Sequence, residues 1–427
     1  MTRVVITGLG AITPIGNDVD TFWENMKAGV SGADYISAFD ASDYNIQIAC
    51  EVKGFDPGDW IDKKTAKRLA RSTQMAIATT HQALKDANFK VTEENAKRVG
   101  IVINSGGGGL PVMEEATHKL LSSGPRSVSP FLITSIMMNA VSSMVSIEFG
   151  TMGPLNSSAL ACASGNYALL DAYHIIKRGE ADVVISGGAE AAISPVIFAS
   201  FARMGALSPN NMDPKRASRP FDKDRDGFVF GEGAATLILE SEEHAKARGA
   251  TIYGEILGGS LTSDGHHVTA PKPDGSGSGE AIKRALEYCG KKPEDVDVIF
   301  AHATSTPLGD TAETVALKNV LGERAYQIPI TGTKSLVGHM LGAAGAVAAL
   351  AAVKSMQEGI VSPTINYETP DPECDLDYVP NEARPYKADL ALVNAFGFGG
   401  HNCVIAVGSY HENGTGQNGT GHKNGAA

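Results

Sequence analysis

Two patterns of apolar residues alternate along the chain. Short runs rich in β-branched residues, each ended by small residues, lie at 3–10, 98–106, 181–188, 297–303 and 389–397. Between them, residues 72–87 and 167–179 carry apolar positions at the spacing of an amphipathic helix. This alternation predicts an α/β protein with largely parallel sheets, in which sites gather at the carboxyl ends of strands.

The pattern occurs twice. A small-residue elbow at Cys162 precedes an apolar helix, a polar stop and a strand ending in glycines, and residues 331–400 repeat that order. We therefore expect two related halves, residues 1–250 and 251–410. Residues 411–427 are rich in Gly and Asn and almost without apolar side chains, so they are predicted to form a disordered tail.

Composition excludes several classes of protein. The 427 residues are 43% hydrophobic and 20% charged, which suits a globular chain with two cores. No apolar run reaches the roughly 18 residues of a membrane span, and the start of the chain is too polar for a signal peptide. The five cysteines are scattered without a C-x-x-C pair, so we expect no zinc site and no disulfide framework. We expect a cytoplasmic location instead.

The charge distribution leaves room for one acidic partner. A net charge of −12 argues against general nucleic-acid binding. A local basic stretch nevertheless contains Lys63, Lys64, Lys67, Arg68 and Arg71, about one helical turn apart. It is either a solvated helix face or a docking surface.

Two of the glycine-rich stretches do not fit nucleotide-binding motifs. Residues 104–111 lack the Gly-Lys-Ser/Thr ending of a P-loop, and residues 8–16 lack a clean G-x-G-x-x-G pattern. A third stretch, residues 397–402, follows a strand and permits close approach of the backbone to a ligand.

Cys162 is a candidate nucleophile because it stands at the mouth of a predicted helix among small residues. A helix N-terminus supplies partial positive charge and free N–H groups, which lower the pKa of a thiol and could hold an oxyanion. The alternative is a buried structural cysteine, which is the commoner role for a lone thiol.

Two histidines favour the catalytic interpretation. His302 ends a strand-like run and is followed by three hydroxyl side chains, and His339 opens a helix of small residues five positions after Lys334. Either imidazole alone would more often be a structural hydrogen-bonding group. The pair favours a Cys-His-His site, which only folding could assemble.

Six motifs resemble, in the same order, those of the β-ketoacyl-[acyl-carrier-protein] synthases, most closely the type II enzymes of dissociated fatty acid synthesis. They are "RVVITGLGAITPIG", "ACASG", "SRPFDKDRDGFVFGEGA", "AHATSTPLGD", "GTKSLVGHMLGAAGA" and "NAFGFGGHN". The resemblance covers nearly the whole chain except the tail. It implies a thiolase-like fold, with two related αβαβα halves in a five-layered sandwich, and a homodimer.

The resemblance also implies an activity. The family transfers an acyl group to a cysteine and condenses it with malonyl-acyl-carrier protein, giving 3-oxoacyl-acyl-carrier protein in fatty acid elongation. Its partner is the acidic acyl-carrier protein, which brings the phosphopantetheine, so no resident cofactor is implied. Two neutral imidazole donors could hold the enolate charge without a metal.

Roles follow by position. Cys162 matches the nucleophile, His302 and His339 the pair that stabilises the enolate, and Lys334 a lysine supporting that pair. The backbone N–H groups of Cys162 and Phe398 match the oxyanion hole, and the Phe398 ring matches a gate. Positions matching substrate-binding residues are Gly107, Thr269, Thr304 and Thr306. Positions matching or standing near carrier-docking residues are Lys64, Lys67, Arg68 and Arg203.

Three departures from the family leave the substrate open. Ala303 replaces the usual glycine, and its methyl group is expected to narrow the pantetheine channel. Ala348 replaces a glutamate that commonly pairs with the lysine at position 334. Gly107 replaces a bulky aliphatic residue that often closes the acyl pocket, so longer or bulkier chains are expected to fit.

Three alternatives therefore stay open. The first is a polyketide-type ketosynthase of a specialised pathway. A thiolase is the second, but it would need a further catalytic cysteine, and Cys403 lies inside a strand-like run. The third is a non-catalytic chain-length partner subunit, which Cys162 opposes because such subunits lack the nucleophile.

Overall fold

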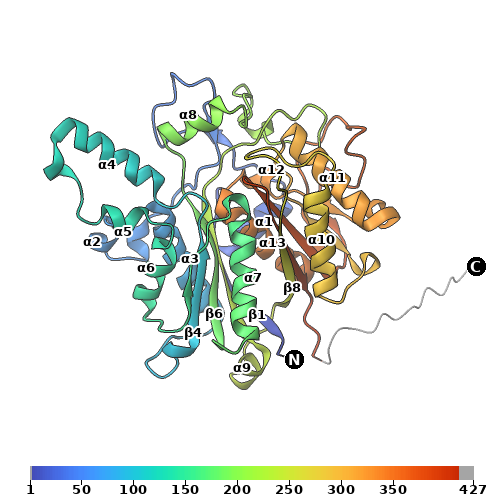
Figure 1. The fold of residues 1–427 in the computed structure, drawn as a ribbon, viewed down its shortest axis with the longest axis horizontal. Helices are drawn as coiled ribbons and strands as arrows, with labels where there is room; N and C mark the ends of the chain where they lie inside the picture. Colours follow the sequence, from blue (N-terminus) through green and yellow to red (C-terminus); the bar gives the residue numbers. More distant parts are fainter. Residues whose placement is uncertain (1, 413–427) are drawn as a thin grey trace, which may run out of the picture.

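The computed structural model describes residues 2–412, so residues 413–427 of the predicted tail lie outside it. A ten-stranded sheet runs in the order β10-β9-β13-β14-β8-β1-β7-β6-β4-β5 (Figure 1). Its first-half strands are β1 (Val4–Ile12), β4 (Val99–Asn104), β5 (Leu155–Asn156), β6 (Val183–Glu190) and β7 (Gly233–Ser241). Its second-half strands are β8 (Gly254–Ser263), β9 (Val298–Phe300), β10 (Ile330–Thr331), β13 (Leu390–Gly397) and β14 (His401–Gly408). Two small sheets pair β2 (Asp34–Tyr35) with β3 (Ile48–Ala49) and β11 (Ile360–Val361) with β12 (Arg384–Pro385).

The helices are mostly short. The first half contains α1 (Val19–Lys27), α2 (Lys63–Ala66), α3 (Arg71–Asp86), α4 (Leu110–Ser123), α5 (Leu132–Ile136), α6 (Ala140–Phe149), α7 (Ser164–Lys177) and α8 (Pro195–Arg203). After α9 (Glu242–Ala247) come α10 (Ser276–Tyr288), α11 (Pro307–Leu321), α12 (Lys334–Val337) and α13 (Ala344–Glu358). The helices predicted at 72–87 and 167–179 are confirmed as α3 and α7.

The two halves are related about the centre of the sheet. Read outwards from the middle, β1-β7-β6-β4-β5 has the same arrangement as β8-β14-β13-β9-β10. The short antiparallel pairing of β1 with β8 joins the halves. The predicted boundary near residue 250 lies in the connection between β7 and β8.

The expectation of largely parallel sheets is wrong for the centre of the sheet. Parallel pairing is confined to the outer strands, β6-β4-β5 and β13-β9-β10. Every pair from β13 through β14, β8, β1 and β7 to β6 is antiparallel. The pattern missed β7 and β8, because the Gly, Ser and Thr residues of these strands weaken the apolar signal.

Five layers result. Helices α3 and α6 cover the outer face of the first half-sheet, and α10 and α11 cover the outer face of the second (Figure 1). Between the half-sheets lie α7 and α13: α7 packs on β4 and β6 and also on β8 and β14, and α13 packs on β7 and β13. Among residues 2–412, no helix is both long and apolar enough to cross a bilayer.

The two middle-layer helices begin side by side. A Cβ atom on Gly165, at the start of α7, would lie 2.8 Å from the backbone O of Gly342 and from the backbone N of Ala346. A Cβ atom on Gly345 would lie 2.3 Å from Asn166 Oδ1. Only glycine permits this approach. It places the elbow before α7, with Cys162, beside the elbow before α13, which follows His339.

Candidate active site

Cys162 lies in a 3-10 turn, Ala161–Ala163, directly before α7. Ala161 has a φ of 48°, a left-handed conformation that costs a non-glycine residue about 1 kcal/mol or more. The Ser164 hydroxyl braces the turn, because it donates to the backbone O of Ala161 at 2.7 Å and accepts from the backbone N–H of Leu160 at 2.9 Å. The elbow thus presents a buried sulfur to a cavity.

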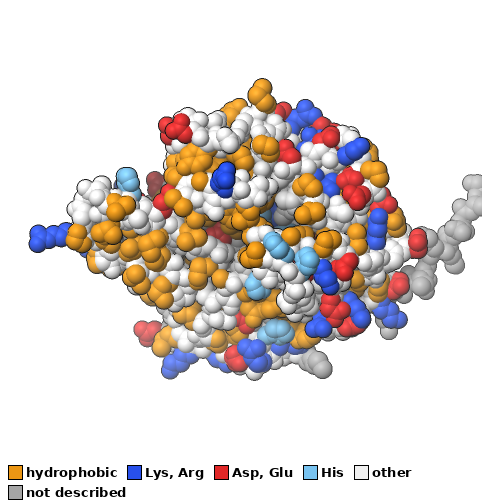
Figure 2. All heavy atoms as spheres, turned by 45° about the horizontal axis from the view of Figure 1, so that its top comes forward, with side chains coloured by type: hydrophobic (Ala, Val, Ile, Leu, Met, Phe, Trp, Pro, Cys, Tyr) orange, Lys and Arg blue, Asp and Glu red, His pale blue; other side chains and the backbone are white. Residues whose placement is uncertain are grey.

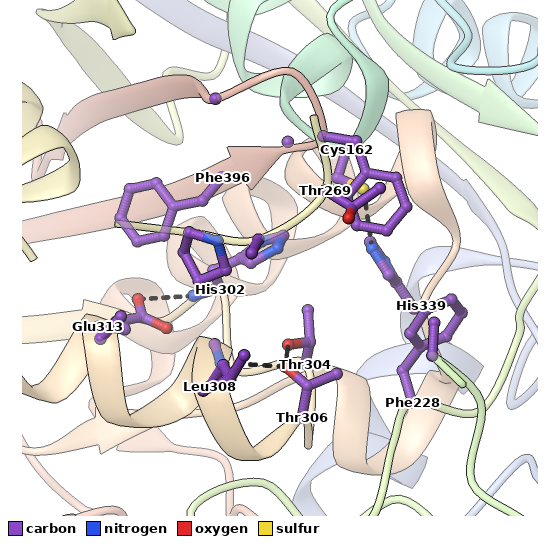
Figure 3. A pocket seen from close by; sticks show the side chains of 18 of the residues that line it. Cys162, Phe228, Thr269, His302, Thr304, Thr306, Leu308, Glu313, His339 and Phe396 are labelled. Carbon is purple, nitrogen blue, oxygen red and sulfur yellow. Dashed lines mark hydrogen bonds between the residues drawn. The ribbon is translucent and has the colours of Figure 1, made fainter. Parts of the chain in front are cut away.

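Folding gathers both histidines beside that sulfur (Figure 3). His339 Nε2 lies 3.0 Å from Cys162 Sγ. The rings of His302 and His339 are nearly perpendicular, with centroids 5.5 Å apart. Phe228 packs edge-on against His339 at 5.1 Å. The three predicted residues therefore share the floor of one pocket.

Hydrogen bonds hold the backbone of both histidines in place. His339 donates its backbone N–H to Val229 O at 2.7 Å, and its own carbonyl accepts from Gly231 N at 3.0 Å. His302 follows β9, and its backbone N–H donates to the buried Glu313 carboxylate at 2.8 Å. A strand-like bridge and an internal carboxylate thus fix the backbone that carries each ring.

Lys334 supports His302 directly. Its Nζ lies 3.4 Å from His302 Nδ1 and donates to the His302 backbone carbonyl. Burial lowers the pKa of Lys334 to about 8, and the negative charge of Glu313 limits that fall. At neutral pH the lysine therefore still carries most of its charge.

The imidazoles rest neutral. Burial, and after it the charge of Lys334, holds the pKa of both His302 and His339 well below the usual value for histidine. Each imidazole ring is therefore uncharged and has one N–H group that can donate a hydrogen bond.

The thiol behaves differently from the sequence-based expectation. A lowered pKa is predicted for a cysteine at a helix mouth, but burial raises the pKa of the Cys162 thiol to about 11. The charge of Lys334 and the N–H groups of Phe398 and Cys162 act in the lowering direction without reversing the effect of burial. The resting side chain is therefore a thiol.

Two cavities meet at the sulfur. The outer channel, of about 380 Å³, is lined by Thr269, Thr304 and Thr306 together with both histidines. The inner cavity, of about 170 Å³, is lined by Gly107 and mostly apolar side chains. The residues that line both cavities are Cys162, Phe201, Leu341 and Phe398. Phe398 thus stands between the two cavities, as a gate would.

Ala303 does not have the expected effect. The methyl group of Ala303 is buried and does not line the outer channel. It lies against Gly332, where an added Cβ atom would be only 2.9 Å from it. The expectation that this methyl group narrows the pantetheine channel is therefore wrong. The consequence is conformational instead, because Ala303 has a φ of 43°, in the region that favours glycine.

Ala348 replaces the glutamate that commonly pairs with this lysine, but other carboxylates supply negative charge near Lys334. Ala348 is buried within α13 in the central core. The buried carboxylates of Glu313 and Asp310 instead act on Lys334.

The basic stretch is not one helical face, because α2 ends at Ala66 and α3 begins at Arg71. Lys64, Lys67 and Arg68 are exposed there. Arg71 is not part of this exposed group: its guanidinium pairs with the Glu232 carboxylate at 2.8 Å. Arg203, at the end of α8, is also exposed and precedes two residues that line the outer channel.

Two residues of the site escaped the sequence analysis. Phe228 shapes the His339 side of the pocket, and Glu190 lies buried behind the inner cavity. The only signal for Glu190 was a carboxylate at the end of an apolar strand, "VVISGGAE". In the described part of the chain, no group of three or more His, Cys, Asp or Glu side chains is arranged to hold a metal ion.

The layered two-half fold, with a thiol and two neutral imidazoles at the meeting of two cavities, defines a thiolase-like condensing enzyme. The model of the "Beta-ketoacyl synthase, N-terminal domain" matches residues 1–245, and that of the "Beta-ketoacyl synthase, C-terminal domain" matches residues 253–368. The chain therefore belongs to the β-ketoacyl synthase family, and the resemblance stated from its motifs is confirmed.

Curated relatives agree. The chain is 49% identical over 408 residues to "3-oxoacyl-[acyl-carrier-protein] synthase 2" of Synechocystis sp., covering 96% of this chain and 98% of the relative. It is 47% identical over 403 residues to the protein of the same name from Staphylococcus aureus (strain COL), covering 94% of this chain and 97% of the relative.

Solved structures confirm the predicted fold. A type II PKS ketosynthase, in complex with its acyl-carrier protein and bound to the hexaketide, superposes with a TM-score of 0.89 at 33% identity, covering 96% of this chain and all of that one. A β-ketoacyl synthase from Burkholderia phymatum gives the same TM-score and coverage at 36% identity.

Proposed function

We propose that this β-ketoacyl synthase condenses an acyl group carried on Cys162 with malonyl-acyl-carrier protein, giving 3-oxoacyl-acyl-carrier protein in fatty acid elongation. The observation that carries the proposal is the 3.0 Å contact between Cys162 Sγ and His339 Nε2, with the His302 ring alongside. The names of the two curated relatives support the same reaction.

Acyl transfer comes first. The sulfur of Cys162 attacks the thioester carbonyl of the acyl-carrier protein, and the backbone N–H groups of Cys162 and Phe398 stabilise the oxyanion. The new carbon–sulfur bond forms on Cys162 as the pantetheine thiol departs. The proton of the Cys162 thiol ends on the departing pantetheine sulfur, so the exchange consumes no net acid or base.

Decarboxylation follows in the same pocket. The N–H groups of His302 and His339 donate to the thioester oxygen of the malonyl group, so the electrons of the breaking carbon–carbon bond form an enolate as CO₂ leaves. The enolate carbon attacks the acyl carbonyl, so a carbon–carbon bond forms and the bond between that carbonyl carbon and Cys162 Sγ breaks. The released thiolate of Cys162 takes a proton from water. Because both imidazoles are neutral donors, they stabilise the negative charge mainly where it develops.

The two cavities divide the substrate. The outer channel holds the pantetheine arm, with the paired hydroxyls of Thr304 and Thr306 (2.9 Å apart) and Thr269 along it. The inner cavity takes the acyl chain past Phe398. Because the arm comes with the carrier, we propose no resident cofactor or metal.

The lining of the inner cavity favours a reduced acyl chain over a polyketide. A poly-β-keto chain carries carbonyl oxygens along its length, which need donors when buried. Apart from Cys162, the only hydroxyl or thiol side chain among the lining residues is Ser200. The curated relatives named 3-oxoacyl-[acyl-carrier-protein] synthase 2 are 47–49% identical to this chain, and the type II PKS ketosynthase is 33% identical.

Two partners belong to the proposal. An acidic acyl-carrier protein would be steered by the exposed basic side chains of Lys64, Lys67, Arg68 and Arg203.

A second copy of the chain would cover the lobe at the left of Figure 2, where apolar side chains gather. Exposed apolar residues on α4, α5, α6 and the edge strand β5 include Leu120, Leu121, Ile133, Ile147 and Leu155. We place the reaction in the cytoplasm, because all five cysteines are free thiols.

The test uses purified protein, malonyl-acyl-carrier protein and saturated acyl-carrier thioesters of increasing length, with products weighed by mass spectrometry. We expect one two-carbon extension, with the acyl group trapped on Cys162. Cys162→Ala should abolish it, and Cys403→Ala, in the buried strand β14, should not. An unacylated Cys162 would contradict the proposal and favour a partner subunit. Repeated extension without reduction would indicate a polyketide ketosynthase.

A further inference from the structure

The buried Glu190 carboxylate joins the two halves of the molecule behind the active site. It ends β6 and is fully buried. Oε1 accepts from Ser105 Oγ at 3.0 Å, and Oε2 accepts from the backbone N–H groups of Gly106 at 2.7 Å and Gly342 at 3.0 Å. The Gly107 N–H is shared between both oxygens, at 3.2 and 3.3 Å.

These donors belong to functional segments. Gly106 and Gly107 form one wall of the inner cavity. Gly342 follows Leu341, which lines both cavities, and lies three residues after His339. A Cβ atom on Gly106 would be 3.2 Å from the backbone O of Ala161, so the elbow of Cys162 lies against the same point.

The chemistry of the site requires a carboxylate. An uncompensated buried charge is costly, and here burial raises the pKa of Glu190 while the N–H groups of Gly342 and Gly106 favour its ionised form. An amide has one accepting oxygen: it could still serve Gly106 and Gly342, but its NH₂ group would face Ser105. The negative charge of Glu190 also raises the pKa of the Cys162 thiol.

We propose that Glu190 is a positioning residue for the condensation, whose carboxylate fixes the glycine wall of the inner cavity and the elbow after His339 in one arrangement about Cys162. This inference rests on the proposed function. If Glu190 has this role, the selectivity for acyl chains and the reactivity of the Cys162 thiol both depend on a side chain that lines neither cavity.

Two variants separate position from charge. Glu190→Ala removes every acceptor, and Glu190→Gln removes the charge while keeping an oxygen for the glycine N–H groups. The matched control is Glu240→Gln, a buried glutamate whose partners line neither cavity. These partners are Thr7, His244 and Arg248.

Two measurements are made on each variant: kcat/KM for a long and a short acyl-carrier thioester, and the pH profile of Cys162 alkylation by iodoacetamide. We expect Glu190→Ala to lower the long-to-short ratio about tenfold, because the wall that a long chain touches loses its fixed geometry. Both Glu190 variants should move the alkylation profile to lower pH, since removing a nearby negative charge favours the thiolate. Glu240→Gln should change neither.

The outcomes are distinguishable. Folded Glu190 variants with an unchanged ratio and profile would overturn the inference, even if their melting temperatures fall. If Glu190→Ala does not fold, the long-to-short ratio of Glu190→Gln decides, because its amide group can no longer accept from both Ser105 and the glycine N–H groups. A wild-type protein that condenses no acyl chain would instead remove the proposed function, independently of Glu190.

Discussion

At the scale of single residues, the site is assembled from backbone conformations that side chains usually avoid. Ala161, Ala303 and Leu341 all have positive φ angles, of 48°, 43° and 38°. Ala161 and Leu341 occupy equivalent elbows, one before each middle-layer helix. Surrounding contacts must hold such conformations, and at Ala161 the Ser164 hydroxyl is one of them.

Ala303 gives a prediction at this scale. Ala303→Gly should leave the KM for acyl-carrier protein unchanged, because the methyl group does not line the outer channel. Its stability should change by about 1 kcal/mol or less, since relief of the positive φ offsets the lost packing and the greater entropy of unfolded glycine. Urea unfolding and steady-state kinetics measure the two quantities. A clear fall in KM would restore the narrowed-channel interpretation.

At the scale of elements, the inner cavity is bounded by the loop between β4 and α4 and by α8. Gly107, in that loop, lines the cavity without a side chain. An added Cβ atom would be in tight contact with Glu190 Oε1, at 3.3 Å, and in ordinary contact with Leu110 Cδ1, at 3.5 Å. Under the proposed function, we expect the length of the accepted acyl chain to depend on where this loop and α8 approach each other.

Gly107→Ile should shorten the accepted acyl chain, because a branched side chain would occupy the cavity beside Leu110. We expect kcat/KM for long thioesters to fall at least about tenfold, with short ones nearly unaffected. Gly279→Ala on α10 is a suitable control, since its added Cβ atom would meet only ordinary contacts of 3.5 Å or more. An unchanged chain-length profile would argue that acyl chains take another route.

At the scale of the whole molecule, the ten-stranded sheet ends in β5, a two-residue strand with both side chains exposed. Beside it, α6 exposes Ile147, which is 72% accessible. An open sheet edge flanked by apolar side chains is typical of a surface that another chain covers.

Ile147→Glu should weaken the proposed homodimer, because a charge would be buried in the apolar contact. Analytical ultracentrifugation across a dilution series should show monomer appearing at higher protein concentration than in the wild type. Met212→Glu is the control: Met212 is 93% accessible and follows Asn211, which contacts Tyr35 and Asn45 rather than α6 or β5. Identical sedimentation of Ile147→Glu and wild type would place the interface elsewhere.

Much of the fold was predictable from short-range patterns. Apolar periodicity marked α3, α7 and the strands that precede His302 and Phe398, because those segments are buried on at least one face. The antiparallel centre was missed, since β7 and β8 are rich in small residues, and sequence alternation does not report strand direction.

The sequence by itself was enough to predict which groups do the chemistry: the thiol, the two imidazoles and the lysine stand in short motifs, and the family resemblance of those motifs assigns their roles. Only the tertiary structure decided the protonation states of these groups and the hydrogen bonds that hold them in place. Burial, which is a property of the packed whole, reverses the expected shift in the pKa of Cys162 and keeps both histidines neutral. The contacts of Glu190 join residues 105–107 to residue 342, and a separation that long leaves no trace in a local pattern.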